Sequence, residues 1–145
     1  MANNLSANVA NYAIRTFDGR VLAYGPSGGD DSTIPPPPKP VIAYPPSVRP
    51  QQFSIGQLEQ EKNRYYINAL IERNNLLYDQ LTAPQQWVIT FVPVPNRVVF
   101  TIQKEDGQLW VAPKDGEEGQ IRVERILYKD PPKYPDNVLF ELAPL

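Results

Sequence analysis

Proline is the residue that most constrains how this chain can fold. There are 17 prolines among the 145 residues, and nine of them lie between Pro26 and Pro50. Each proline fixes φ and lacks a backbone N–H donor, so it interrupts an α-helix. This density excludes a bundle of long helices and predicts a chain made mostly of short strands and turns.

The densest part of that region is the run Pro35-Pro36-Pro37-Pro38-Lys39-Pro40. Consecutive prolines adopt extended or polyproline II geometry. Such a run serves either as a stiff connection at the surface or as a ligand for an SH3-like or WW-like domain. Strand-like residues flank the run on both sides, and this position favours the connection.

The missing residue types exclude several classes of function. The chain has no Cys and no His, so the sequence predicts no disulfide, no thiolate nucleophile, no Ser-His-Asp triad, and no metal site or cofactor of the Cys or His kind. Its two pairs of adjacent carboxylates, Asp30-Asp31 and Glu117-Glu118, lie in Gly-containing loops and not across a cleft. We therefore expect no enzymatic activity.

The charge balance and the start of the chain bear on partners and location. The formal net charge is −2, with both signs interspersed, so clustered cations for binding nucleic acid are missing. The first residues lack the apolar run of about 7 to 15 residues typical of a signal peptide. No stretch approaches the roughly 18 apolar residues of a membrane span. We expect a soluble, cytoplasmic monomer that binds neither nucleic acid nor membrane.

Two similar segments predict equivalent hairpins. Tyr12-Ala13-Ile14 is followed by Asp18-Gly19, and Phe100-Thr101-Ile102 is followed at the same offset by Asp106-Gly107. Asp-Gly between alternating apolar residues is a strong hairpin signal, because both central positions of a type I′ turn need positive φ. A looser third copy begins at Tyr65-Tyr66-Ile67.

Each copy ends in an aromatic strand that contains Phe53, Trp87 or Phe140. Three repeats with an opening hairpin and a closing strand predict an all-β fold, a β-trefoil with pseudo-threefold repeats. We expect one domain over 1–145, with repeats at about 10–57, 63–95 and 96–145, the middle one shortened, and with the three aromatics in the core. Helical spacing competes with strand alternation over 54–82, and the flanking copies favour strands.

From Pro84 onward the chain strongly resembles the fungal (mushroom) β-trefoil serine protease inhibitors, a group related to the mycocypins and the ricin-B-like lectins. The N-terminal half matches only in general pattern. This resemblance implies a β-trefoil without enzymatic activity that inhibits trypsin-like proteases through a surface loop. The motifs that carry it are Gln86-Trp87-Val88-Ile89, Val99-Phe100-Thr101-Ile102, Gly107-Gln108-Leu109-Trp110-Val111-Ala112-Pro113, Gly119-Gln120-Ile121-Arg122-Val123 and the segment from Pro131 to Leu142.

Members of that family use different loops, so the reactive residue is argued from chemistry. A substrate-like inhibitor of a trypsin-like enzyme needs Lys or Arg on a stiff, extended segment. Lys39 and Arg49 each precede a proline, which blocks approach to the scissile bond. Arg20 lies in a tight hairpin, where the chain cannot lie extended.

The remaining candidate is the loop from Tyr128 to Asp136. Lys133 follows Pro132 and precedes Tyr134, and the surrounding prolines hold the chain extended around the Lys133-Tyr134 bond. Lys129 is the weaker candidate, because its neighbour Asp130 is a carboxylate that would lie beside an active-site serine. The same run could also simply turn the chain into its last strand.

A carbohydrate-binding lectin is the alternative function. Trefoil lectins place an Asp, an aromatic and a polar residue in each repeat, and here only Asp18 and Asp106 recur. Loss of the third site would weaken the avidity that equivalent sites provide. The sequence thus favours an inhibitor whose partner is a trypsin-like serine protease.

Overall fold

The computed structural model describes residues 10–26, 37–59, 63–80, 85–126 and 134–145. Apart from one 3-10 helix, η2 (Asp136–Val138), the regular elements in these ranges are β-strands. In chain order the strands are β1 (Ala10–Thr16), β2 (Val21–Tyr24), β3 (Lys39–Tyr44), β4 (Phe53–Glu59), β5 (Arg64–Ile67), β6 (Leu70–Arg73), β7 (Leu76–Asp79), β8 (Trp87–Val94), β9 (Arg97–Gln103), β10 (Leu109–Val111), β11 (Gly119–Gln120), β12 (Arg122–Glu124) and β13 (Phe140–Pro144).

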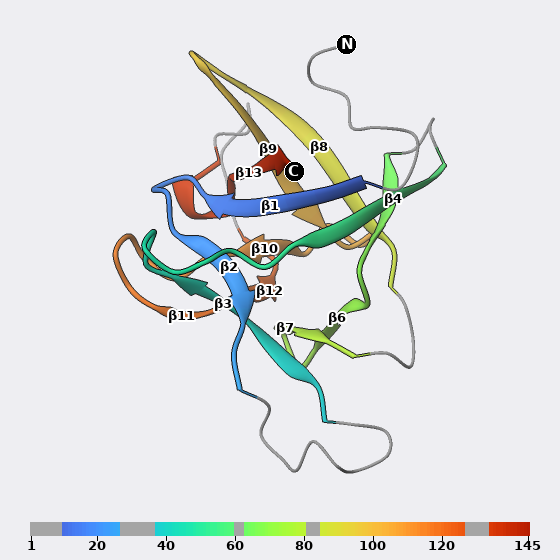
Figure 1. Cartoon of the computed structure of the whole chain (residues 1–145). Helices are drawn as coiled ribbons and strands as arrows, with labels where there is room; N and C mark the ends of the chain where they lie inside the picture. Colours follow the sequence, from blue (N-terminus) through green and yellow to red (C-terminus); the bar gives the residue numbers. More distant parts are fainter. Residues whose placement is uncertain (1–9, 27–36, 60–62, 81–84, 127–133) are drawn as a thin grey trace.

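The strands pair antiparallel into a closed barrel (Figure 1). Pairing runs from β1 through β4, β5, β8, β9, β10, β12, β7, β3 and β2 and returns to β1, a closed circuit of ten strands. The last strand, β13, pairs with both β1 and β9. Closure satisfies backbone groups that an open sheet would leave at its edges.

The predicted all-β class is confirmed, but the predicted β-trefoil is wrong, because the strands form a closed ten-strand antiparallel barrel. Alternating apolar residues and turn residues identify strands, yet they do not specify which strands pair. The length of the paired region also differs from one strand pair to the next. β8 and β9 align from Val88↔Gln103 to Val94↔Arg97, whereas β5 and β8 share only Arg64↔Val88 and Tyr65↔Trp87.

Both predicted Asp-Gly turns are present, with a different geometry from the one expected. Gly19 (φ 92°) and Gly107 (φ 95°) have positive φ, whereas Asp18 and Asp106 do not. Gly19 N donates to Thr16 O at 3.1 Å, and Gly107 N donates to Lys104 O at 3.0 Å. The turns are therefore longer than the type I′ form, with glycine alone in the left-handed region.

The strand interpretation of residues 54–82 is confirmed where the structure describes that segment, which contains part of β4 and all of β5, β6 and β7. Asn74 (φ 54°) and Asn75 (φ 66°) join β6 to β7. Two consecutive left-handed residues are the signature of the type I′ turn, and they make this the third hairpin. The helical spacing of apolar residues in this segment therefore does not correspond to a helix in the residues that the structure describes.

The three predicted core aromatics, Phe53, Trp87 and Phe140, are all fully buried. Trp110 links two of them, with ring centres 5.4 Å from Trp87 and 5.8 Å from Phe140, edge to face. The Trp87 indole N–H donates to Leu70 O at 3.0 Å, so its polar atom is satisfied in the core. These rings fill the centre of the barrel and fix the strands that carry the site.

Two sequence features outside the core also have a place in the structure. Pro40 lies in β3, opposite Tyr78 of β7. The start of the proline run, Pro35 and Pro36, lies outside the described residues. Within the described ranges, no helix is long and apolar enough to cross a membrane.

Candidate functional site

The predicted reactive loop lies mostly outside the described residues. Lys129, Pro132 and Lys133 belong to 127–133, whereas Tyr134 is the first described residue after that gap. What the structure does show is how the chain on each side of 127–133 is held.

The N-terminal stem is β12. Val123 is fully buried and lies opposite Trp110 of β10. Its backbone N–H donates to Asn75 O in the β6–β7 turn at 2.8 Å. β12 also pairs with β7 through Arg122 and Leu76, so this stem is fixed on both sides.

The C-terminal stem is η2 together with Leu139. It is attached beside β10, the strand that also pairs with β12. Ala112 N donates to Asn137 O at 2.8 Å, and the Asn137 side chain Nδ2 donates back to Ala112 O at 3.1 Å. Val138 is fully buried, and Leu139 is 4% exposed. Both stems are therefore attached to the same part of the barrel, at β10 and the residue after it.

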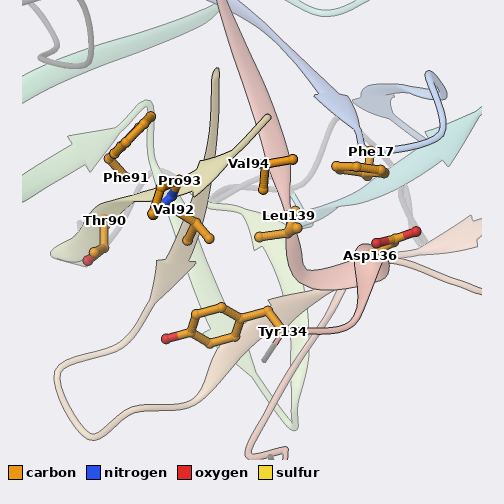
Figure 2. Close-up of a pocket in the computed structure, with 9 residues that line it drawn as sticks. All are labelled: Phe17, Thr90, Phe91, Val92, Pro93, Val94, Tyr134, Asp136 and Leu139. Carbon is orange, nitrogen blue, oxygen red and sulfur yellow. The ribbon is translucent and has the colours of Figure 1, made fainter. Parts of the chain in front are cut away.

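Tyr134 contributes to a pocket of about 450 Å³ beside the C-terminal stem. Figure 2 shows Tyr134, Leu139 and the valines of β8 around this space, with Phe17 and Asp136 toward one side. Tyr134 is half-buried, and Asp136 is exposed. The pocket residues come from three separate parts of the chain, and nothing in the sequence pattern indicated that they would meet.

Besides its place in a tight hairpin, Arg20 has a second property that makes it unsuitable as a reactive residue. Its side chain is 4% exposed. The guanidinium donates to Asp18 Oδ1 at 2.9 Å, to Glu117 O at 2.6 Å and to Pro113 O at 2.9 Å. A cation committed to three acceptors inside the protein is not available to an enzyme pocket.

The other two basic candidates occupy different settings. Lys39 is the first residue of β3 and pairs with Asp79, so it belongs to a strand and not to a free loop. Arg49 is exposed in the turn between β3 and β4, where Val48 N donates to Pro45 O at 3.0 Å. Arg49 also borders a polar cavity of about 520 Å³ lined by amide side chains.

The aspartates that suggested a lectin are engaged within the protein. Asp18 accepts from Thr16, Arg20 and Gly116 N, the last at 3.1 Å. Burial alone would raise the pKa of the Asp18 carboxyl, but these hydrogen bonds outweigh burial and lower it. Asp106 accepts from Gln108 N at 3.0 Å and lies 3.8 Å from Lys104 Nζ. The structure therefore offers no support for the lectin alternative.

The part of the chain that the structure describes contains no group of three or more Asp, Glu, His or Cys side chains that could hold a metal ion. The expected absence of a cofactor stays a prediction. The candidate functional features of the described residues are the two fixed stems, the apolar pocket beside them and the cavity at Arg49.

Comparison with known proteins adds a family and a fold. A sequence profile described as "Peptidase inhibitor I66" matches residues 6–144. No curated protein matches the chain significantly. Among solved structures, the chain is similar to one described as "High resolution structure of proteinase inhibitor from Coprinopsis cinerea", with a TM-score of 0.73 and 21% identity over 97% of this chain and 100% of that chain. At this identity the likeness concerns the fold.

Proposed function

The chain belongs to the peptidase inhibitor I66 family, and we propose from this premise that it inhibits a trypsin-like serine protease through the segment between β12 and η2. The observation that carries the proposal is the extent of the family match, which covers residues 6–144. The family match and the fold of the Coprinopsis cinerea inhibitor confirm the predicted resemblance to fungal protease inhibitors. A relationship to the mycocypins, a single domain, a monomeric state and a cytoplasmic location stay predictions.

The proposed mechanism is substrate-like binding. Lys133 enters the acidic S1 pocket, with Pro132 and Tyr134 on either side of it, and Lys129 is the alternative reactive residue. The stems support this mechanism, because Val123 and Asn137 are both hydrogen-bonded to the barrel. A segment presented in this way enters the cleft at a low entropic cost, and this favours tight binding.

The fixed stems also explain why the protein would act as an inhibitor and not as a substrate that is cleaved and released. If the Lys133–Tyr134 bond is cut, the new ends remain attached to the same part of the barrel through β12 and Asn137. The cut ends then stay at a high effective concentration near each other. Resealing competes with release, so an inhibitor of this kind leaves the enzyme slowly.

The experiment is to measure inhibition constants for Lys133→Ala and Lys129→Ala against trypsin, with chymotrypsin and papain in the same panel. Hot-spot truncations that leave a desolvated partner charge unpaired cost about 2 to 4 kcal/mol. Because each 1.4 kcal/mol is tenfold, Lys133→Ala should weaken trypsin inhibition by at least about thirtyfold. Its melting temperature should stay near that of the wild type, because an exposed loop lysine contributes little to stability.

The matched control is Lys114→Ala, which removes an exposed lysine from the loop between β10 and β11. Inhibition by this variant should be unchanged. A loss confined to Lys129→Ala would move the reactive bond four residues upstream. Full inhibition by both loop variants would exclude this segment, and no inhibition of trypsin by the wild-type protein would contradict the proposed target class.

A further inference from the structure

The pocket beside Tyr134 lies on the outward face of the β8–β9 hairpin. Its volume of about 450 Å³ falls in the range of small-molecule sites, roughly 300–1,000 Å³. In Figure 1 the hairpin extends away from the other strands. Residues 90–94 of β8 border the pocket, and the side chains of Thr90, Val92 and Val94 share one face of the strand (Figure 2).

Strand alternation explains why these three residues face outward. Successive side chains of a strand point to opposite faces. Phe91 packs on Phe100, edge to face, with ring centres 6.0 Å apart, and joins the core. Figure 2 shows Phe91 pointing away from Leu139 and Tyr134. Its neighbours Thr90 and Val92 therefore project to the other face, out of the barrel.

The outward face of the hairpin is covered on β9 but not on β8. Val92 lies opposite Val99, and Thr90 lies opposite Thr101. Val99 and Thr101 are at most 1% exposed, whereas Val92 is half-buried and Thr90 is exposed. An apolar recess therefore remains beside β8, bounded on its other side by Tyr134 and Leu139.

The charges around the recess are unequal. The Arg97 guanidinium stacks 3.8 Å from the ring centre of Phe17, and it donates to Phe17 O at 2.8 Å and to Glu141 Oε1 at 2.7 Å. Arg97 and Glu141 thus balance each other. Asp136 contributes a carboxylate to the pocket, and within the described ranges no basic side chain is paired with it. Among the described residues at the recess, the excess charge is therefore negative.

We propose that this pocket binds a small organic cation with a flat apolar body, such as an arylmethylammonium ion. The valines and Leu139 take the ring system, and the Asp136 carboxylate pairs with the ammonium group. Tyr134 adds an aromatic ring, and aromatic faces attract cations electrostatically, as Arg97 on Phe17 already illustrates at this site. The inference does not depend on which protease is the target or on which lysine is reactive, although Tyr134 belongs to both proposed sites.

The test is isothermal titration calorimetry of the full chain with three probes that share one ring. The probes are 2-naphthylmethylamine, protonated at neutral pH, the neutral 2-naphthylmethanol and the anionic 2-naphthylacetate. The cation should bind about tenfold or more tighter than the anion, with the alcohol between them. Equal affinities for cation and anion, or no heat from any probe at millimolar concentration, would overturn the proposal.

Variants assign the binding to this pocket. Val92→Phe fills the recess and should weaken binding of the cation at least tenfold, whereas Val98→Phe makes the same change on the other face of the hairpin, at a residue 49% exposed, and should leave binding within twofold. Asp136→Asn should bring the affinities for the amine and the alcohol to within threefold of each other, without loss of fold. Unchanged binding by both Val92→Phe and Asp136→Asn would contradict the proposal.

Discussion

Arg20 joins two loops that lie far apart in the sequence. Through its guanidinium, the turn between β1 and β2 is attached to Pro113 O and Glu117 O in the loop between β10 and β11. Asp18 adds a second contact between the same loops, because it accepts from Gly116 N at 3.1 Å. At this position a basic side chain connects two loops of the barrel, so its role is structural.

Arg20→Ala should lower the free energy of unfolding by about 3 kcal/mol. The variant leaves the partly buried carbonyls of Pro113 and Glu117 without this donor. It also removes the charge partner of Asp18, which keeps Thr16 and Gly116 N as donors. Unsatisfied buried groups cost roughly 1–3 kcal/mol each before relaxation and water entry. Urea denaturation followed by tryptophan fluorescence measures the change. Arg49→Ala, at an exposed position, is the control and should stay within about 0.5 kcal/mol of the wild type. A similarly small change in Arg20→Ala would show that water replaces the guanidinium.

Among elements, the contact between Lys104 and Glu72 links the turn after β9 to strand β6. Lys104 Nζ donates to Glu72 Oε1 at 2.8 Å, and Glu72 Oε2 accepts from Asn75 N at 3.0 Å. The hydrogen bond from Lys104 lowers the pKa of Glu72 from its ordinary 4.5. The same bond raises the pKa of Lys104 above 10.5.

The stability that this pair adds should depend on pH in two places. A lowered carboxyl pKa contributes stability above pH 4.5, and the contribution is lost as pH falls through the folded-state pKa. A raised lysine pKa contributes below pH 10.5, and the contribution is lost as pH rises through its folded-state value. The difference in unfolding free energy between wild type and Glu72→Gln should therefore be about 1 kcal/mol from roughly pH 5 to 10 and shrink outside that range.

Glu72→Gln is suitable for this comparison because it keeps an acceptor for Asn75 N while it removes the charge. Urea midpoints at pH 3, 5, 7, 9 and 11 measure the effect. Lys104→Met serves as the second arm and should follow the same profile, since it removes the other half of one pair. A difference that does not vary between pH 3 and pH 7 would mean that the ionic contact contributes nothing.

The hairpins could be predicted from sequence because their signals are local. Asp18-Gly19 and Asp106-Gly107 form turns in the structure, and Asn74 and Asn75 supply the left-handed residues of a third. Pairing between distant strands has no local signal. β3 joins β7 through Lys39 and Pro40, a contact that depends on how the whole chain closes. This is why the three sequence repeats led to a trefoil and the structure is a barrel.

For the candidate site, the sequence likewise predicts the local feature and not the contacts between distant segments. The prolines before Tyr134 marked a stiff segment, and the structure supplies the hydrogen bonds at Asn137 that hold its end. The apolar pocket could not be predicted in the same way. Phe17 follows β1, Val92 lies in β8 and Leu139 precedes β13, so these residues become neighbours only in the folded barrel. In the sequence, each is an ordinary apolar residue of a strand or turn.

At the scale of the whole molecule, β13 holds the end of the chain in the barrel. It pairs with β1 over residues Tyr12↔Pro144 to Thr16↔Phe140 and meets β9 at Phe100. Phe140 is fully buried, and Leu142 is 9% exposed. Burial of each such side chain stabilises the fold by about 1.5–3 kcal/mol, so this strand is part of the core and not an appendage.

This arrangement predicts the behaviour of the chain after proteolysis. If trypsin cuts the Lys133–Tyr134 bond during long incubation, the fragment 134–145 should stay bound, because β13 and the Asn137 hydrogen bonds remain intact. Denaturing electrophoresis and mass spectrometry should then show two fragments, whereas size-exclusion chromatography should show one species that elutes with the intact protein. The nicked protein should also retain inhibition of trypsin, since both stems keep their places. Elution of the short fragment alone under native conditions would show that β13 does not hold it, and would remove the reason to expect slow release from the enzyme.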